Sequence, residues 1–266
     1  MTDAMLTRAE LTAISAARDA GAILRTRFRE QDTLTVERKG LPDFVTEVDR
    51  QCENAIVGRL RADFPEIAVQ AEEGSPDEAL APVRWIVDPL DGTTNFIQGV
   101  PTFAVSIGLL DEHGLAAGVV FDPVHDELFH AVRGSGARLN GQPLQVSAKD
   151  DLHDAVLATG FPFRMFEKLD GYVATLRTFM TSTAGIRRAG SAALDLAHTA
   201  CGRYDAFFEV GLSPWDLAAG ALLVVEAGGQ VTDCGGGDRF LECGEIVAGG
   251  PGLHPAVLEV TRRHLA

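Results

Sequence analysis

Residues 85–96 constrain the fold most, because an apolar run stops there at two acids three residues apart. Trp85-Ile86-Val87 predicts a short buried strand, and Gly92-Thr93-Thr94-Asn95 supplies turn and cap types for a following helix. Asp88 and Asp91 fall between them. Carboxylates are the ligands that Mg²⁺ prefers, and a helix start attracts phosphate. The corner therefore suits a metal-bound phosphate, although Asp-Pro and Asp-Gly pairs are also ordinary turn chemistry.

Length and charge narrow the class of protein. A chain of 266 residues can bury a substantial core as one large domain or two moderate ones. Its net charge of −15 disfavours nonspecific binding to nucleic acid or anionic membranes. The sequence has neither a signal-peptide core nor the roughly 20 apolar residues of a membrane span, which predicts a cytoplasmic protein. Because the charge would also repel a phosphorylated substrate, a phosphate site here needs cations that reverse the local field.

Apolar spacing predicts helices and then a β meander in the first half. Apolar residues three and four apart indicate helices over about residues 6–29 and over Val48–Leu60, with a loop at Lys39–Asp43 between them. Three β-rich runs predict antiparallel strands: Phe103–Leu110, Leu115–Asp122 and Glu127–Val132.

Beyond a tight turn at Asn140-Gly141, short strands alternate with helices. The predicted helices are Arg164–Met180, Ala192–Cys201, Pro214–Ala227 and His254–His264, and the predicted strands are Val156–Thr159, Ala206–Glu209, Gln230–Asp233 and Ile246–Ala248. We therefore expect an N-terminal α+β half, residues 1–145, that carries most metal ligands. A C-terminal α/β half, residues 146–266, would carry Asp216 and the substrate-pocket wall, with a cleft between the halves.

The string Asp88-Pro-Leu-Asp91-Gly-Thr-Thr-Asn resembles the signature of the inositol monophosphatase family of Mg²⁺-dependent phosphatases. Segments 43–49, 71–74 and 212–220 agree with that family in order and spacing, and segments 158–163 and 187–196 look like its bacterial members. The resemblance covers nearly the whole chain. It implies a layered αβαβα sandwich of the inositol monophosphatase and fructose-1,6-bisphosphatase type, a homodimer and inhibition by Li⁺.

The resemblance also implies roles for individual residues. Two or three Mg²⁺ ions, with Mn²⁺ as a possible substitute, would bind Glu72, Asp88, the Leu90 carbonyl, Asp91 and Asp216. Glu72 and Thr93 would hold the attacking water, activated by the metal, while Asp49 orients the Thr93 hydroxyl. The substrate would contact Gly92, Thr93, Thr94, Arg187, Gly190, Ser191, Ala192, Glu209 and Asp216.

Local sequence leaves simpler interpretations open for the residues of the first half. Thr46 and Asp49 suit the start of the second helix and would serve there only as caps. Glu72 and Glu73 follow a predicted strand, and an adjacent pair of acids is more often part of a solvated loop. The resemblance makes Glu72 the ligand and gives Glu73 a supporting role.

The second half has the same ambiguity. Asp216 follows Pro214 in the first turn of a predicted helix, where any acid is favourable. Glu209 could cap a strand, and Arg187 could be a surface charge.

The sequence thus predicts a phosphomonoesterase that hydrolyses myo-inositol 1-phosphate, or a similar polyol phosphate, to inositol and phosphate. Histidinol phosphate, fructose 1,6-bisphosphate and a 3′-phosphoadenosine nucleotide are alternative substrates for the same metal core. The absence of long insertions disfavours the last two. A different class of hypothesis is a noncatalytic scaffold that binds a macromolecular partner.

Overall fold

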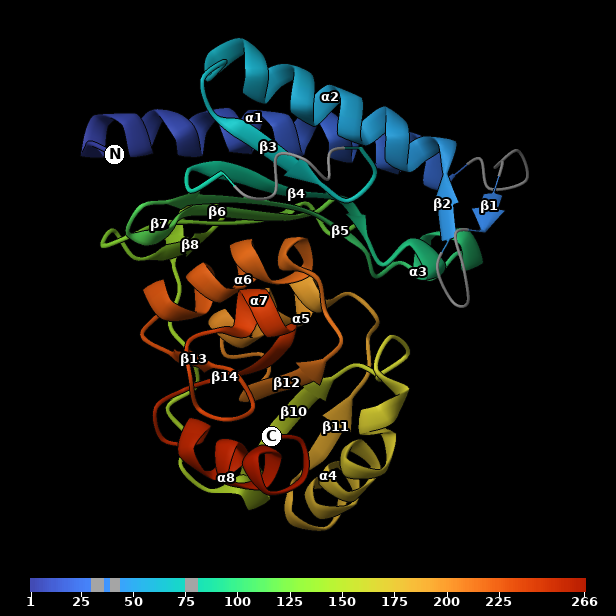
Figure 1. Ribbon diagram of the computed structural model, residues 1–266, viewed down its shortest axis with the longest axis vertical. Helices are drawn as coiled ribbons and strands as arrows, with labels where there is room; N and C mark the ends of the chain where they lie inside the picture. The colour runs from blue at the N-terminus through green and yellow to red at the C-terminus, as the bar shows by residue number, and fades with distance from the viewer. Residues whose placement is uncertain (30–35, 39–43, 75–80) are drawn as a thin grey trace.

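The computed structural model describes residues 1–29, 36–38, 44–74 and 81–266, and it has five alternating layers (Figure 1). Helices α1 (Asp3–Phe28) and α2 (Glu47–Asp63) cover one face of a seven-stranded sheet. Helices α5 (Ala192–Ala200) and α6 (Pro214–Glu226) lie between this sheet and a five-stranded one. Helices α4 (Leu169–Ser182) and α8 (His254–His264) cover the outer face of the second sheet. The predicted αβαβα sandwich is confirmed.

The first sheet has the strand order β3-β4-β5-β6-β7-β8-β9. Its strands are β3 (Ala68–Ala71), β4 (Arg84–Asp91), β5 (Ala104–Asp111), β6 (Gly114–Asp122), β7 (Glu127–Val132), β8 (Ala137–Leu139) and β9 (Gln142–Pro143). Strands β3 and β4 are parallel, and β5, β6 and β7 form the predicted antiparallel meander. A separate pair, β1 (Val36–Arg38) and β2 (Phe44–Thr46), precedes α2.

The second sheet has the order β11-β10-β12-β14-β13. Its strands are β10 (Val156–Thr159), β11 (Gly185–Arg187), β12 (Ala206–Val210), β13 (Gln230–Thr232) and β14 (Glu245–Gly249). Short helices α3 (Thr93–Gln98) and α7 (Phe240–Cys243), with 3₁₀ turns at Leu152–Asp154 and Phe166–Lys168, complete the described elements.

The largest error in a predicted boundary is at the start of one helix, and one prediction cannot be compared. The helix expected from Arg164 begins at Leu169. Residues 163–164, which follow Pro162, form a turn, and Phe166–Lys168 form a 3₁₀ helix before α4 begins. The loop expected at Lys39–Asp43 lies outside the described residues. No helix in the part of the chain that the structure describes is long and apolar enough to cross a membrane.

Two glycines let helix α6 approach the first sheet closely. A Cβ atom on Gly118 of β6 would lie 2.8 Å from the carbonyl oxygen of Ala219, and one on Gly108 of β5 would lie 2.8 Å from the Ala218 Cβ. Real Cβ atoms do not come this close, so larger residues would push the helix away. Since α6 also carries Asp216, this packing sets the position of a predicted metal ligand.

We expect Gly118→Ala to lower the free energy of unfolding by about 1–3 kcal/mol, because the added methyl group overpacks an interface with backbone. The same substitution at Gly58, exposed on α2 with nothing within 4 Å of its Cβ position, is the matched control. It should raise the free energy of unfolding by about 0.4–1 kcal/mol. Denaturant unfolding measures both, and equal values for the two variants would contradict the close approach.

Candidate active site

Two of the predicted ligands owe their common orientation to an irregularity in strand β4. Side chains three residues apart point to opposite faces of a regular strand. The pairing of β4 with β5 shifts register between Asp88 and Asp91, which is a bulge centred on Pro89 and Leu90. A bulge adds a residue and re-aims side chains, and it tolerates proline. Both carboxylates therefore point to the same site, where Asp88 Oδ1 accepts a hydrogen bond from the Leu90 N–H at 2.9 Å.

A third carboxylate comes from the first turn of α6. Asp216 accepts a hydrogen bond from the Ser213 N–H at 2.8 Å in a capping box, and Pro214 occupies the first helical turn. The buried Ser106 hydroxyl donates to the Trp215 carbonyl at 3.0 Å and fixes the helix start against β5. Carboxylate oxygens of Asp88, Asp91 and Asp216 all lie within 4.8 Å of one another, and all three residues are buried. We call these three residues the acidic trio.

The environment of the acidic trio favours a bound cation. Burial raises the pKa of Asp88 well above its usual range, and the charges of Glu72, Asp91 and Asp216 raise it further. Burial followed by the charge of Asp216 raises the pKa of Asp91 to about 7, although hydrogen bonds from Ser191 and Ala193 oppose the shift. Three ionised carboxylates this close are stable only with positive charge among them. An oxygen-only donor set fits Mg²⁺ or Mn²⁺, so the residues present suit the cation that the sequence predicts.

Glu72 lies beside the acidic trio without belonging to it. It follows β3, lines the same cavity and contributes to the raised pKa of Asp88, but the mutually close oxygens do not include its own. Its neighbour Glu73 is held at the backbone, where the N–H donates to Glu53 Oε2 at 2.9 Å.

Asp49 is both a helix cap and a partner of Thr93. Its Oδ2 accepts from the Thr46 backbone N–H at 2.8 Å, which completes the capping box of α2. Its Oδ1 lies 3.3 Å from the Thr93 hydroxyl, which also lies 3.0 Å from the Leu90 carbonyl oxygen. The capping interpretation is therefore correct, and it does not exclude the predicted contact with Thr93.

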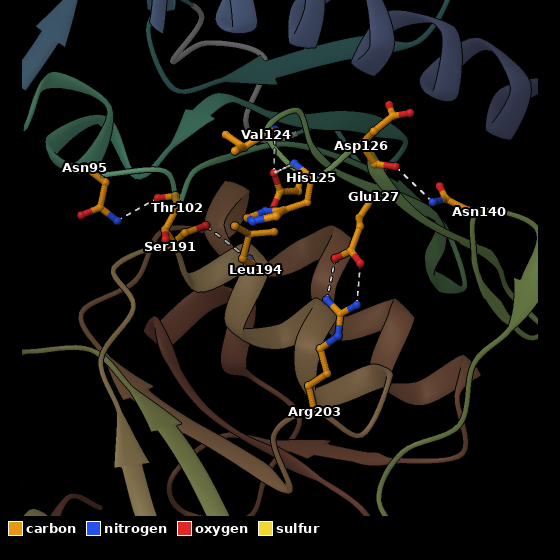
Figure 2. Close-up of polar contacts among 11 residues, drawn as sticks. Asn95, Thr102, Val124, His125, Asp126, Glu127, Asn140, Ser191, Leu194 and Arg203 are labelled. Atoms are coloured by element: carbon orange, nitrogen blue, oxygen red, sulfur yellow. Dashed lines mark hydrogen bonds and ion pairs between the residues drawn. The ribbon is translucent and has the colours of Figure 1, made fainter. Parts of the chain in front are cut away.

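Asp91 joins the first sheet to the start of helix α5. Its Oδ2 accepts hydrogen bonds from the Ser191 hydroxyl at 2.6 Å and from the Ala193 N–H at 2.7 Å. Ser191 also caps α5 by accepting from the Leu194 N–H at 3.3 Å (Figure 2). The sequence predicts Ser191 as a substrate contact. In the structure the Ser191 hydroxyl donates its hydrogen bond to Asp91.

The side chains of Asn95 and Arg203 each contact the other half of the chain. The Asn95 amide nitrogen donates to the Ala189 carbonyl at 2.9 Å and, within its own half, to the Thr102 carbonyl at 2.8 Å (Figure 2). Both terminal nitrogens of Arg203 reach the Glu127 carboxylate at 2.5 Å. A bidentate pair of this kind fixes orientation as well as distance.

A cavity of about 370 Å³ opens at the acidic trio. Every residue that the sequence predicts for the site lines it except Asp49, which lies behind Thr93, and Arg187. The neighbouring Arg188 lines the cavity instead, with its guanidinium 5.2 Å and 5.7 Å from the ring centroids of Phe161 and Phe163. Lining residues that the sequence reading missed are Asn95, Thr159, Gly160, Phe161, Phe163, Arg164, Arg188, Asp195, Gly211 and Leu212.

The fold and the acidic trio define a phosphatase-type sandwich with a metal-binding site. The profile of the inositol monophosphatase family matches residues 5–266. A protein named Nus factor SuhB from Pseudomonas aeruginosa is 51% identical over 258 residues, which are 95% of this chain and 95% of the relative. This chain therefore belongs to the inositol monophosphatase family.

Solved structures agree with that assignment. The extragenic suppressor protein suhB from Bartonella henselae has a TM-score of 0.90 and 41% sequence identity, covering 96% of this chain and 98% of the other. An inositol monophosphatase from Anabaena (Nostoc) has a TM-score of 0.86 and 37% identity, with 97% of each chain covered.

Proposed function

We propose that this protein is a Mg²⁺-dependent phosphomonoesterase that hydrolyses myo-inositol 1-phosphate or a similar polyol phosphate. The observation that carries the proposal is the acidic trio, which is buried, includes two carboxyls with raised pKa values (Asp88 and Asp91) and lines a cavity large enough for a small molecule. The helix start at Gly92–Thr94 lines the same cavity and suits a phosphate group.

Asp88, Asp91 and Asp216, with Glu72 and the Leu90 carbonyl, would hold the cations. Bound there, the cations would neutralise the phosphoryl oxygens and lower the pKa of the attacking water. This concentration of charge suits phosphate monoesters, whose enzymatic hydrolysis requires accelerations of up to about 10²¹-fold. General acid–base catalysis alone provides about 10²- to 10⁴-fold.

The protein's own groups would position the water and the ester. The single proton of the Thr93 hydroxyl has two acceptors within reach, the Leu90 carbonyl at 3.0 Å and Asp49 Oδ1 at 3.3 Å. With the proton donated to either, the lone pairs of the hydroxyl are free to accept a hydrogen bond from water. The Glu72 carboxylate would then accept the second proton of that water. The N–H groups at the start of α3 would hold the phosphate so that the ester oxygen leaves opposite the water.

The names of relatives support a second candidate function. The protein from Pseudomonas aeruginosa with 51% identity is named a Nus factor, which favours a macromolecular partner for this chain as well. That role would use the surface of the fold and needs no hydrolysis. An Asp91→Asn variant that lost hydrolysis and kept the cellular phenotype would support it. The homodimer, the cytoplasmic location and the lack of nonspecific nucleic-acid binding remain predictions.

A panel of phosphate esters assayed with Mg²⁺ tests the first function. We expect the highest kcat/KM for myo-inositol 1-phosphate, lower values for histidinol phosphate, fructose 1,6-bisphosphate and 3′-phosphoadenosine nucleotides, and loss of activity on chelation. Li⁺ should inhibit, as the family's cation site implies. No hydrolysis of any ester with Mg²⁺ or Mn²⁺, or full activity at high millimolar Li⁺, would contradict the assignment.

A further inference from the structure

Asp195 is a buried acid that the proposed hydrolysis does not use. It is 1% exposed, it lines the cavity, and its Oδ1 has no hydrogen-bond partner within the described ranges. A buried carboxylate oxygen without a partner is destabilising, and native proteins rarely keep one without a reason. The cavity beside it offers that reason, since a ligand could supply the missing donor.

The position of Asp195 on α5 points it toward the site. Its backbone N–H donates to the Ser191 carbonyl at 3.0 Å, so the two residues lie one helical turn apart on the same face. Ser191 in turn contacts Asp91 of the acidic trio. Asp195 therefore lies one helical turn from a residue that contacts the acidic trio, on the wall of the same cavity.

A second carboxylate shares this wall. Glu209 of β12 lines the cavity, and the charge of Asp195 contributes to raising the pKa of Glu209 after burial, so the two acids are near each other. A Cβ on Gly160 would lie 1.8 Å from Glu209 Oε1. The Glu209 carboxylate therefore occupies space that is available only because residue 160 is a glycine. Burial, followed by the charge of Asp91, also raises the pKa of Asp195 well above its usual range. Arg188 is the positive group that opposes the shifts of Asp195 and Glu209, and it stacks on Phe161 and Phe163.

Two carboxylates that line one cavity and are close enough to interact electrostatically suit a ligand with more than one donor. Hydroxyl groups donate to carboxylate oxygens, and neutral hydroxyls add no charge to a wall that already carries two acids. A second phosphate or carboxylate on the ligand would be repelled there. The wall therefore favours a neutral polyol group over a bisphosphate.

We propose that Asp195 is a specificity-determining residue that accepts a hydrogen bond from a hydroxyl of the alcohol part of the substrate, beside Glu209. The inference rests on the proposed phosphatase function and identifies the chemistry that selects its substrate.

The test compares two esters in three variants. We expect Asp195→Ala to lower kcat/KM for myo-inositol 1-phosphate about tenfold more than for phenyl phosphate, which has no hydroxyl on its ring. Asp195→Asn keeps an acceptor oxygen and should recover most of that ratio. Thr199→Val is the matched control, because Thr199 is buried one turn further along α5 and its hydroxyl donates to the Asp195 carbonyl at 2.8 Å. The control should leave the ratio unchanged.

Mg²⁺ affinity, measured by calorimetry, should change less than about twofold in Asp195→Ala, and the melting temperature should not fall, because an unpartnered buried acid is removed. An equal loss for both esters, or no loss for either, would overturn the inference while leaving the proposed function intact. If the wild type hydrolysed no ester, the proposed function would fail. Equilibrium binding of myo-inositol with Mg²⁺ and inorganic phosphate would then decide the inference, with equal affinity in wild type and Asp195→Ala overturning it.

Discussion

The Asp91→Asn variant is expected to lose at least about 1000-fold in kcat/KM, the largest effect of any single substitution considered for this site. The amide keeps the shape of the side chain and can still accept hydrogen bonds from Ser191 and Ala193, so the fold should persist. It removes the charge that a cation between Asp91, Asp88 and Asp216 requires. Loss of electrostatic stabilisation at a reacting phosphate is worth several kcal/mol, of which about 4 kcal/mol corresponds to 1000-fold. Steady-state kinetics with Mg²⁺ measure it.

The same variant should be at least as stable as the wild type when metal is absent. Removing one of three mutually repelling carboxylates relieves electrostatic strain, so the melting temperature in a chelator should stay the same or rise. Asp122→Asn is the matched control, since Asp122 is 2% exposed and its Oδ1 accepts from the backbone N–H groups of Val124 and His125 outside the cavity. The control should lose stability and keep kcat/KM within about twofold. Near-wild-type hydrolysis by Asp91→Asn would rule out the acidic trio as the cation site.

Periodicity predicted most of the individual helices and strands, whereas their arrangement in layers was predicted from the resemblance to the inositol monophosphatase family. Helix α8 and strands β7 and β10 have the predicted bounds, and the meander pairs as expected. The edge strand β11 was missed, although β13 at the other edge of the sheet is equally short and was predicted. Three residues hold no reliable repeat, so sequence periodicity identifies such strands inconsistently. Tertiary contacts, which local sequence does not report, decide such elements.

For the candidate site, the sequence identified the ligand types but not the geometry that joins them. A spacing of three places Asp88 and Asp91 on opposite faces of an ideal strand, and only the bulge at Pro89 and Leu90 turns both to one side. Proline within a strand was the available signal for that bulge. Whether Arg187 or Arg188 lines the cavity likewise depends on where strand β11 ends, and periodicity does not define that end.

Asp195 was overlooked for a different reason. An acid within the otherwise apolar segment 192–197 of α5 was a signal in itself, because this helix is buried between two sheets. The four-residue spacing from Ser191 would have shown that it shares a face with a residue already assigned to the site. Helical periodicity applied to polar residues, as well as to apolar ones, would have found it.

Mg²⁺ affinity is expected to fall about tenfold for each pH unit below pH 7, because a proton on Asp91 competes with the cation. The pKa of this group in the folded, metal-free protein is about 7, against an ordinary value of 3.8. The pKa of this acid is higher in the folded state than in the unfolded state. Its contribution to stability is therefore fully present below the pKa of the unfolded state, and it is lost as pH rises through the pKa of the folded state. The metal-free protein therefore loses this stability between about pH 4 and pH 7, where Mg²⁺ begins to bind well.

The measurement is the shift in melting temperature on adding saturating Mg²⁺, recorded from about pH 5 to pH 8 together with the dissociation constant from calorimetry. Groups that titrate equally with and without Mg²⁺ do not affect the change in melting temperature that Mg²⁺ causes. His198 is expected to be such a group, and its pKa is lowered to about 4 mainly by burial. The shift should grow with pH and level off above about pH 7, and Asp91→Asn should abolish most of that growth. An Mg²⁺ affinity that stayed constant from pH 5 to pH 7 would mean that Asp91 is already ionised in the metal-free protein. In that case positive charge from the protein itself, and not a bound cation, would have to balance the acidic trio.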